Sequence, residues 1–94
     1  MTNKQRTALR SMANGMETIF SVGKNGVTPD VTAAVADALA AREMVKISVL
    51  NNCETEPREI AETLAGRTRS DVVQVIGKRI VLFKKNPKRE GIAI

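Results

Sequence analysis

Histidine, tryptophan and tyrosine are absent from this chain of 94 residues, which has two phenylalanines and one cysteine. Histidine is the commonest general base and a common metal ligand, and without it neither a serine–histidine nor a cysteine–histidine pair can form. Zinc sites built from cysteine and histidine are excluded for the same reason. The single cysteine, Cys53, cannot form an internal disulfide, which is typical of a reducing compartment. We therefore expect no enzyme, no metal site and no cofactor.

Long apolar runs are also missing. No stretch approaches the roughly 20 apolar residues of a membrane-spanning helix. Residues 1–6 are polar, where a secretory signal would lead into an apolar core. These features predict a cytoplasmic protein that does not act at a membrane. The length suits a single domain over residues 1–94, in which we expect residues 3–85 to form the core and residues 86–94 a polar tail.

Positive charge is concentrated at the two ends of the chain. The formal net charge is +5, with +3 over residues 1–24, −4 over residues 25–65 and +6 over residues 66–94. A chain with basic ends and an acidic middle can fold into a molecule with one basic face, and such a face attracts polyanions. A net charge of this size also serves solubility, so charge alone does not decide between the two interpretations.

Hydrophobic periodicity and turn residues divide the chain into seven elements. Three stretches have helical spacing and start with capping residues, and four are rich in β-branched residues. In chain order we predict a helix over 3–13, a strand over 17–22, a helix that opens at Thr28-Pro29 and includes Ala41, a strand over 44–50, a helix from about Thr55 to Leu64 that Gly66 ends, a strand over 71–76 and a strand over 79–85.

This order predicts an α/β fold. Strands separated by helices usually lie parallel with right-handed crossovers. Gly77-Lys78 forms a two-residue turn, so the last two strands should be an antiparallel hairpin. We therefore expect a four-stranded mixed sheet with three helices packed on it.

The segment Gly23-Lys24-Asn25-Gly26 joins a predicted strand to a predicted helix. Its two glycines allow a sharp turn and a close approach of another backbone. It precedes a helix N-terminus, where free N–H groups and the helix dipole favour a phosphate; Lys24 adds a cation and Asn25 adds amide donors. Nothing in it reads a base, so it should contact nucleic-acid backbone. An ordinary strand-to-helix turn can use the same residues, and the motif alone is weak.

Other basic residues could extend such a site. Arg6 and Arg10 are four residues apart and share a helix face, and further cations follow the Gly77 turn. A solvated helix face, or protection of an edge strand from aggregation, would use the same residues. The two phenylalanines lie in apolar strands and should be core residues, which favours recognition of nucleic-acid shape and backbone over base stacking. The candidate phosphate contacts outside the loop are Lys4, Arg6, Arg10, Lys78, Arg79 and Lys84.

Three separated stretches are similar to one known family. They are FSVGKNGVT at residues 20–28, Ala38-Leu39 followed by REMVKI at residues 42–47, and VQVIGKRIVLF at residues 73–83. The chain resembles the CRM domain (chloroplast RNA splicing and ribosome maturation), in particular its stand-alone bacterial YhbY-like members, over roughly residues 3–85. The resemblance implies an α/β RNA-binding fold, RNA contact at Gly23 to Gly26, and association with precursors of the large ribosomal subunit.

Together these features predict a non-enzymatic, monomeric protein that binds structured ribosomal RNA and takes part in assembly of the large ribosomal subunit. The alternative is a small protein-interaction adapter. In that case the acidic helix with Glu56, Glu59 and Glu62 would be the docking surface, and the basic charge would serve solubility.

Overall fold

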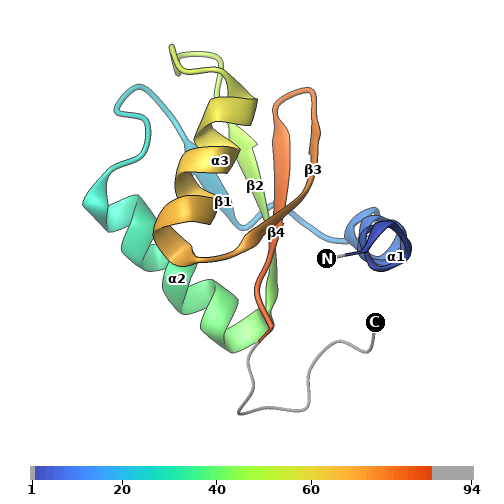
Figure 1. Cartoon of the computed structure of the whole chain (residues 1–94). Coiled ribbons are helices and arrows are strands. Elements are labelled where there is room, and N and C mark those ends of the chain that lie inside the picture. The colour runs from blue at the N-terminus through green and yellow to red at the C-terminus, as the bar shows by residue number, and fades with distance from the viewer. Residues whose placement is uncertain (1, 86–94) are drawn as a thin grey trace.

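The computed structural model describes residues 2–85, so the predicted tail over 86–94 lies outside the described residues (Figure 1). The predicted order of elements is confirmed. The chain forms α1 (Asn3–Ala13), β1 (Phe20–Val22), α2 (Pro29–Arg42), β2 (Met44–Val49), α3 (Pro57–Thr68), β3 (Asp71–Ile76) and β4 (Arg79–Phe83).

The four strands form one mixed sheet in the order β1-β2-β4-β3. β1 pairs with β2 in parallel, and β4 pairs antiparallel with both β2 and β3. It follows that β1, β2 and β3 all run in one direction, with the returning strand β4 between β2 and β3. The predicted four-stranded mixed sheet is thus confirmed, and its two edge strands are β1 and β3.

Hydroxyl caps fix where the first two helices begin. Thr2 Oγ1 accepts a hydrogen bond from the Gln5 N–H at 3.1 Å, and Gln5 Oε1 accepts one from the Thr2 N–H at 3.0 Å, which together form a capping box. Thr28 Oγ1 accepts from the Val31 N–H at 3.1 Å, with Pro29 as the first helical residue. Both starts agree with the sequence prediction.

The sheet has a core on each face. α2 and α3 cover one face, while α1 lies alone on the other (Figure 1). The larger core joins the alternate residues Val45, Ile47 and Val49 of β2 to Leu39 of α2 and Leu64 of α3. The smaller core is under α1 and consists of Leu9, Ala13, Met44, Val73, Val81 and Phe83, with Met16 packed against it. The alternation along β2 therefore sends one set of side chains to each helical layer.

β1 is shorter than the predicted strand over 17–22, because it begins at Phe20. Its pairing reaches back only as far as the Ile19 N–H, which donates to the Lys46 carbonyl at 3.0 Å. Glu17 and Thr18 belong to the connection from α1, which has to cross to the sheet before pairing can begin. The β propensity of residues 17–19 does not show where the connection from α1 ends and pairing with β2 begins.

α3 also differs from the prediction at both ends, since it begins at Pro57 and continues through Gly66 to Thr68. The C-cap that follows Thr68 is Arg69, which adopts the left-handed conformation with φ 58°. Thr68 is buried, and its hydroxyl donates to the Leu64 carbonyl at 2.7 Å, so packing extends the helix past the glycine. The prediction that Gly66 ends the helix was wrong, because an exposed glycine weakens a helix without ending it.

Candidate functional site

The loop Gly23–Gly26 is a tight turn between β1 and α2. The Gly26 N–H donates to the Gly23 carbonyl at 2.9 Å, and Gly26 has a φ of +63°, a conformation that favours glycine. Lys24 and Asn25 form the exposed tip of this turn. Thr28, two residues later, is the N-cap of α2. The predicted strand, turn and capped helix are therefore present in that order.

Gly23 differs from Gly26, because its surroundings and not its φ leave little room for a side chain. A Cβ at this position would lie 3.3 Å from Asn52 Oδ1 and 3.4 Å from Leu50 Cδ1. The same connection is held to β1 by a hydrogen bond of 2.8 Å from the Leu50 N–H to the Val22 carbonyl. The loop is thus supported from one side by residues 50–56.

Three segments meet at one end of the sheet. Since β1, β2 and β3 run in the same direction, the loop Gly23–Gly26, the connection 50–56 and the Gly77-Lys78 turn all follow strands at that end (Figure 1). The Lys78 carbonyl accepts from the Val49 N–H at 2.7 Å, and Lys78 Nζ donates to Asn51 Oδ1 at 2.7 Å. We name this region, with Lys24, Lys78 and exposed Arg79, the loop end.

The loop end carries charges of both signs. A hollow of about 150 Å³ lies beside Lys78 and is lined by Cys53, Glu54, Thr55 and Glu56 among others. The Cys53 Sγ donates to the Thr55 carbonyl at 3.7 Å, so the thiol helps to shape this connection. The positive potential of the loop end therefore comes from Lys24, Lys78 and Arg79 and is reduced by the nearby glutamates.

Arg6 and Arg10 lie elsewhere, on α1 beside the edge strand β3. Arg10 Nε donates to the Val73 carbonyl at 3.3 Å, and this contact joins α1 to β3. Lys4 is exposed on the same helix. β1 and β3 are opposite edges of the sheet, so these three predicted contacts are not part of the loop end. The sequence left open whether the first helix shares a face with the loop, and the fold puts the two at different edges of the sheet.

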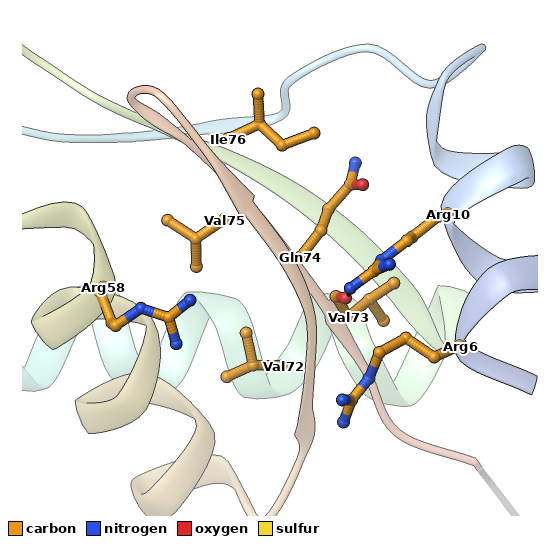
Figure 2. Close-up of a pocket in the computed structure, with 8 residues that line it drawn as sticks. All are labelled: Arg6, Arg10, Arg58, Val72, Val73, Gln74, Val75 and Ile76. Carbon is orange, nitrogen blue, oxygen red and sulfur yellow. Dashed lines mark hydrogen bonds between the residues drawn. The ribbon is translucent and has the colours of Figure 1, made fainter. Parts of the chain in front are cut away.

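A groove of about 430 Å³ runs along β3, and we name it the arginine groove. Residues 72–76 of β3 form its floor, Arg6 and Arg10 reach it from α1, and Arg58 reaches it from α3 on the other side of the strand (Figure 2). Arg58 was not among the residues predicted from the sequence, where it lies between the glutamates of the acidic helix. No local signal marks Arg58, since only the tertiary fold brings it to the β3 edge.

Lys84 is placed at the opposite end of the sheet from the loop. Its backbone N–H donates to the Glu43 carbonyl at 2.8 Å, and its Nζ donates to the Thr68 carbonyl at 3.0 Å. The ammonium therefore satisfies a carbonyl in the last turn of α3. This predicted phosphate contact already has a structural partner.

Both phenylalanines belong to packed regions, as the sequence predicts. Phe83 is 4% exposed and belongs to the core under α1, and Phe20 packs against the larger core. Within residues 2–85 there is no group of three or more Cys, Asp or Glu side chains that could hold a metal ion. None of the three helices in the described part of the chain has the length and apolar character to cross a bilayer.

Comparisons with known proteins agree with this fold. A family model described as the CRS1 / YhbY (CRM) domain matches residues 1–84. The chain is 44% identical over 94 residues to the probable RNA-binding protein YqeI of Bacillus subtilis, covering 100% of this chain and 98% of that protein. It is 31% identical over 88 residues to a probable RNA-binding protein of Pseudomonas aeruginosa, covering 94% of this chain and 85% of the relative.

A solved structure is similar as well. The solution structure of the hypothetical protein SAV1595 from Staphylococcus aureus superimposes with a TM-score of 0.81 at 39% identity, and the match covers 96% of this chain and 94% of that one. Sequence, family model and structure thus agree over nearly the whole chain, and this protein belongs to the CRS1/YhbY (CRM) domain family.

Proposed function

We propose that this protein binds structured RNA, with the loop Gly23–Gly26 as its main contact. The proposal is carried by the geometry of that loop: a tight glycine turn with exposed Lys24 and Asn25 at its tip, directly before the N-terminus of α2. Its family membership supports the same function, because relatives that match nearly its whole length are named as probable RNA-binding proteins.

The loop binds the RNA backbone through charge and through close approach. Gly26 in its left-handed conformation turns the chain sharply, and glycine lacks a Cβ that would hold a sugar-phosphate chain away. Lys24 supplies the attraction, and Asn25 supplies amide donors. Asp30 lies in the first turn of α2, and its negative charge offsets part of the positive potential at this end of the helix. Lys24 therefore contributes more to the attraction for phosphate than the helix dipole does.

The remaining loop-end cations extend this contact. Lys78 is fixed by its bond to Asn51, and Arg79 follows it on β4. Phosphate contacts of this kind position RNA without reading its sequence, so selectivity comes from RNA shape. The family resemblance makes ribosomal RNA of the large subunit the expected ligand. The protein would then act as a monomeric, non-enzymatic assembly factor in the cytoplasm, without a small-molecule substrate.

The test replaces Lys24 and Asn25 with aspartates and measures binding to large-subunit ribosomal RNA transcribed in vitro. A matched control is the A36E/R42E variant, which changes the net charge by the same three units at exposed positions of α2. The loop variant should lose most of its affinity while keeping its circular dichroism spectrum, and the control should lose much less. If K24D/N25D binds as tightly as A36E/R42E, the loop is not the RNA contact.

Crosslinking in cells separates this proposal from the adapter alternative. The protein is crosslinked, purified under denaturing conditions and analysed for attached RNA and attached protein. Recovery of large-subunit ribosomal RNA supports the proposed function. Recovery of protein partners alone favours the adapter, in which the exposed glutamates Glu56, Glu59 and Glu62 of α3 and its N-cap would form the docking surface.

A further inference from the structure

We propose that the arginine groove holds a second segment of RNA backbone, with Arg6, Arg10 and Arg58 contacting its phosphates. This inference rests on the proposed function and adds to it a separate contact on the other edge of the sheet. Three strand spacings separate β1 from β3, which is roughly 14 Å at the usual distance between neighbouring strands. The two contacts therefore engage different parts of the RNA.

The groove has the chemistry of an anion site. The guanidinium groups of α1 and α3 reach the floor strand from its two sides (Figure 2). Among the described residues that line the groove, none is an aspartate or a glutamate. Guanidinium groups are planar and always charged, and they can donate two parallel hydrogen bonds to one phosphate.

Arg6 gives independent support for an anionic ligand. Its Nε is shielded from water and has no hydrogen-bond partner within residues 2–85. A buried donor without an acceptor costs stability, and such a group in a native structure needs an explanation. The shielded Nε is out of reach of a ligand in the unbound arrangement, so a phosphate supplies the missing acceptor by drawing the Arg6 side chain further into the groove.

An extended acidic peptide is the competing ligand, and the strand itself argues against it. A peptide would add to the free edge of β3 as a further strand. The register of β3 shifts between Val72 and Gln74, and the Val73 carbonyl at this bulge already accepts from Arg10. Bulges of this kind disfavour strand addition. The site thus offers cations along an edge that is poorly suited to pairing, which favours a phosphodiester backbone.

The test uses the R6Q/R58Q variant, which leaves the structural bond of Arg10 intact. Its control is R42Q/R67Q, since Arg42 and Arg67 are exposed, lie outside the groove, and are carried by α2 and α3. Both variants reduce the formal net charge from +5 by two units. Affinity for large-subunit ribosomal RNA transcribed in vitro is measured over a series of salt concentrations, with circular dichroism as the check on folding.

The plot of log affinity against log salt has a negative slope. Loss of two phosphate contacts should make this slope shallower by about 1.4–1.8. Affinity should fall by about fivefold to tenfold for each arginine. The control should change the slope by much less. Because the two sites are distant, the losses from R6Q/R58Q and K24D/N25D should multiply in the combined variant. Equal slopes for R6Q/R58Q and R42Q/R67Q would overturn the inference and leave the RNA-binding proposal intact.

The other outcomes are also distinct. If the parent protein does not bind the RNA, the proposed function fails and this inference fails with it. A labelled poly-glutamate peptide tests the competing ligand. If it binds the parent and R42Q/R67Q but not R6Q/R58Q, while all three bind RNA alike, the groove accepts an acidic protein segment and the inference is wrong.

Discussion

Arg10 and Val73 are 63 residues apart in sequence and are joined by a hydrogen bond of 3.3 Å from Nε to the backbone carbonyl. The carbonyl belongs to the bulge in β3, where the regular pairing with β4 shifts. A bulge leaves one residue of an antiparallel pair without its ladder partner. Arg10 therefore donates to a backbone carbonyl at the irregular point of β3 and joins α1 to the edge strand.

This relationship predicts a measurable effect on stability. The R10M variant keeps an unbranched apolar stem but removes the donor. We expect the free energy of unfolding to fall by about 1.5 kcal/mol, the lower end of the range for hydrogen bonds made by a charged group, because Arg10 is exposed. Urea denaturation measures this loss, with K4M as the control because Lys4 is exposed on the same helix. Equal stability of the two variants would show that the Arg10 contact is unimportant for folding.

The continuation of α3 past Gly66 gives a second prediction. Gly66 is exposed in the helix, and a Cβ added there would meet nothing within 4 Å. G66A should therefore raise the free energy of unfolding by about 0.5–1 kcal/mol, because alanine loses less backbone entropy in a helix. G77A is the matched contrast, since Gly77 has a φ of +56° and alanine is strained there. A thermal melt should shift up for G66A and down for G77A.

The sequence predicted the order of elements because the relevant signals are local. Thr2 and Thr28 cap helices that begin where the sequence predicted them, and the strand predicted over 44–50 is β2. The predicted start of β1 and the predicted ends of α3 were wrong because these boundaries are not set by local signals. They depend on where a connection crosses to the sheet and on the burial of Thr68, and neither is local.

In the candidate site too, the local feature could be predicted from the sequence and the non-local one could not. The loop Gly23–Gly26 is contiguous, so the sharp turn and the following cap could both be predicted, and the structure adds that Gly26 is the glycine with a positive φ. The arginine groove could not, because it combines α1, α3 and β3, and its floor is an edge only because β4 is inserted between β2 and β3. Sequence spacing alone does not give that strand order.

The two glycines of the loop should differ in their tolerance of alanine. Gly26 has a φ of +63°, so G26A should lower the free energy of unfolding by about 1–2 kcal/mol. Gly23 is not among the glycines with a positive φ, and its added Cβ would meet the ends of the Asn52 and Leu50 side chains at 3.3 and 3.4 Å. Those side chains can shift, so G23A should cost less than G26A. Urea denaturation of both variants measures the difference, and an equal or larger loss in G23A would contradict this assignment.

Lys46 provides the last prediction, because its ammonium holds the end of α1. Nζ donates to the Ala13 carbonyl at 3.2 Å and to the Met16 carbonyl at 3.3 Å, from a half-buried position on β2. The K46M variant removes the donor and leaves both carbonyls without it, so the free energy of unfolding should fall by about 1.5–3 kcal/mol. Relative to the parent protein, the K46M substitution should accelerate amide hydrogen exchange more in α1 than in α2 or α3. S48A is the control, since Ser48 is half-buried on the same face of the same strand. Uniform exchange across all three helices in K46M would mean that Lys46 stabilises the whole domain and does not specifically hold α1.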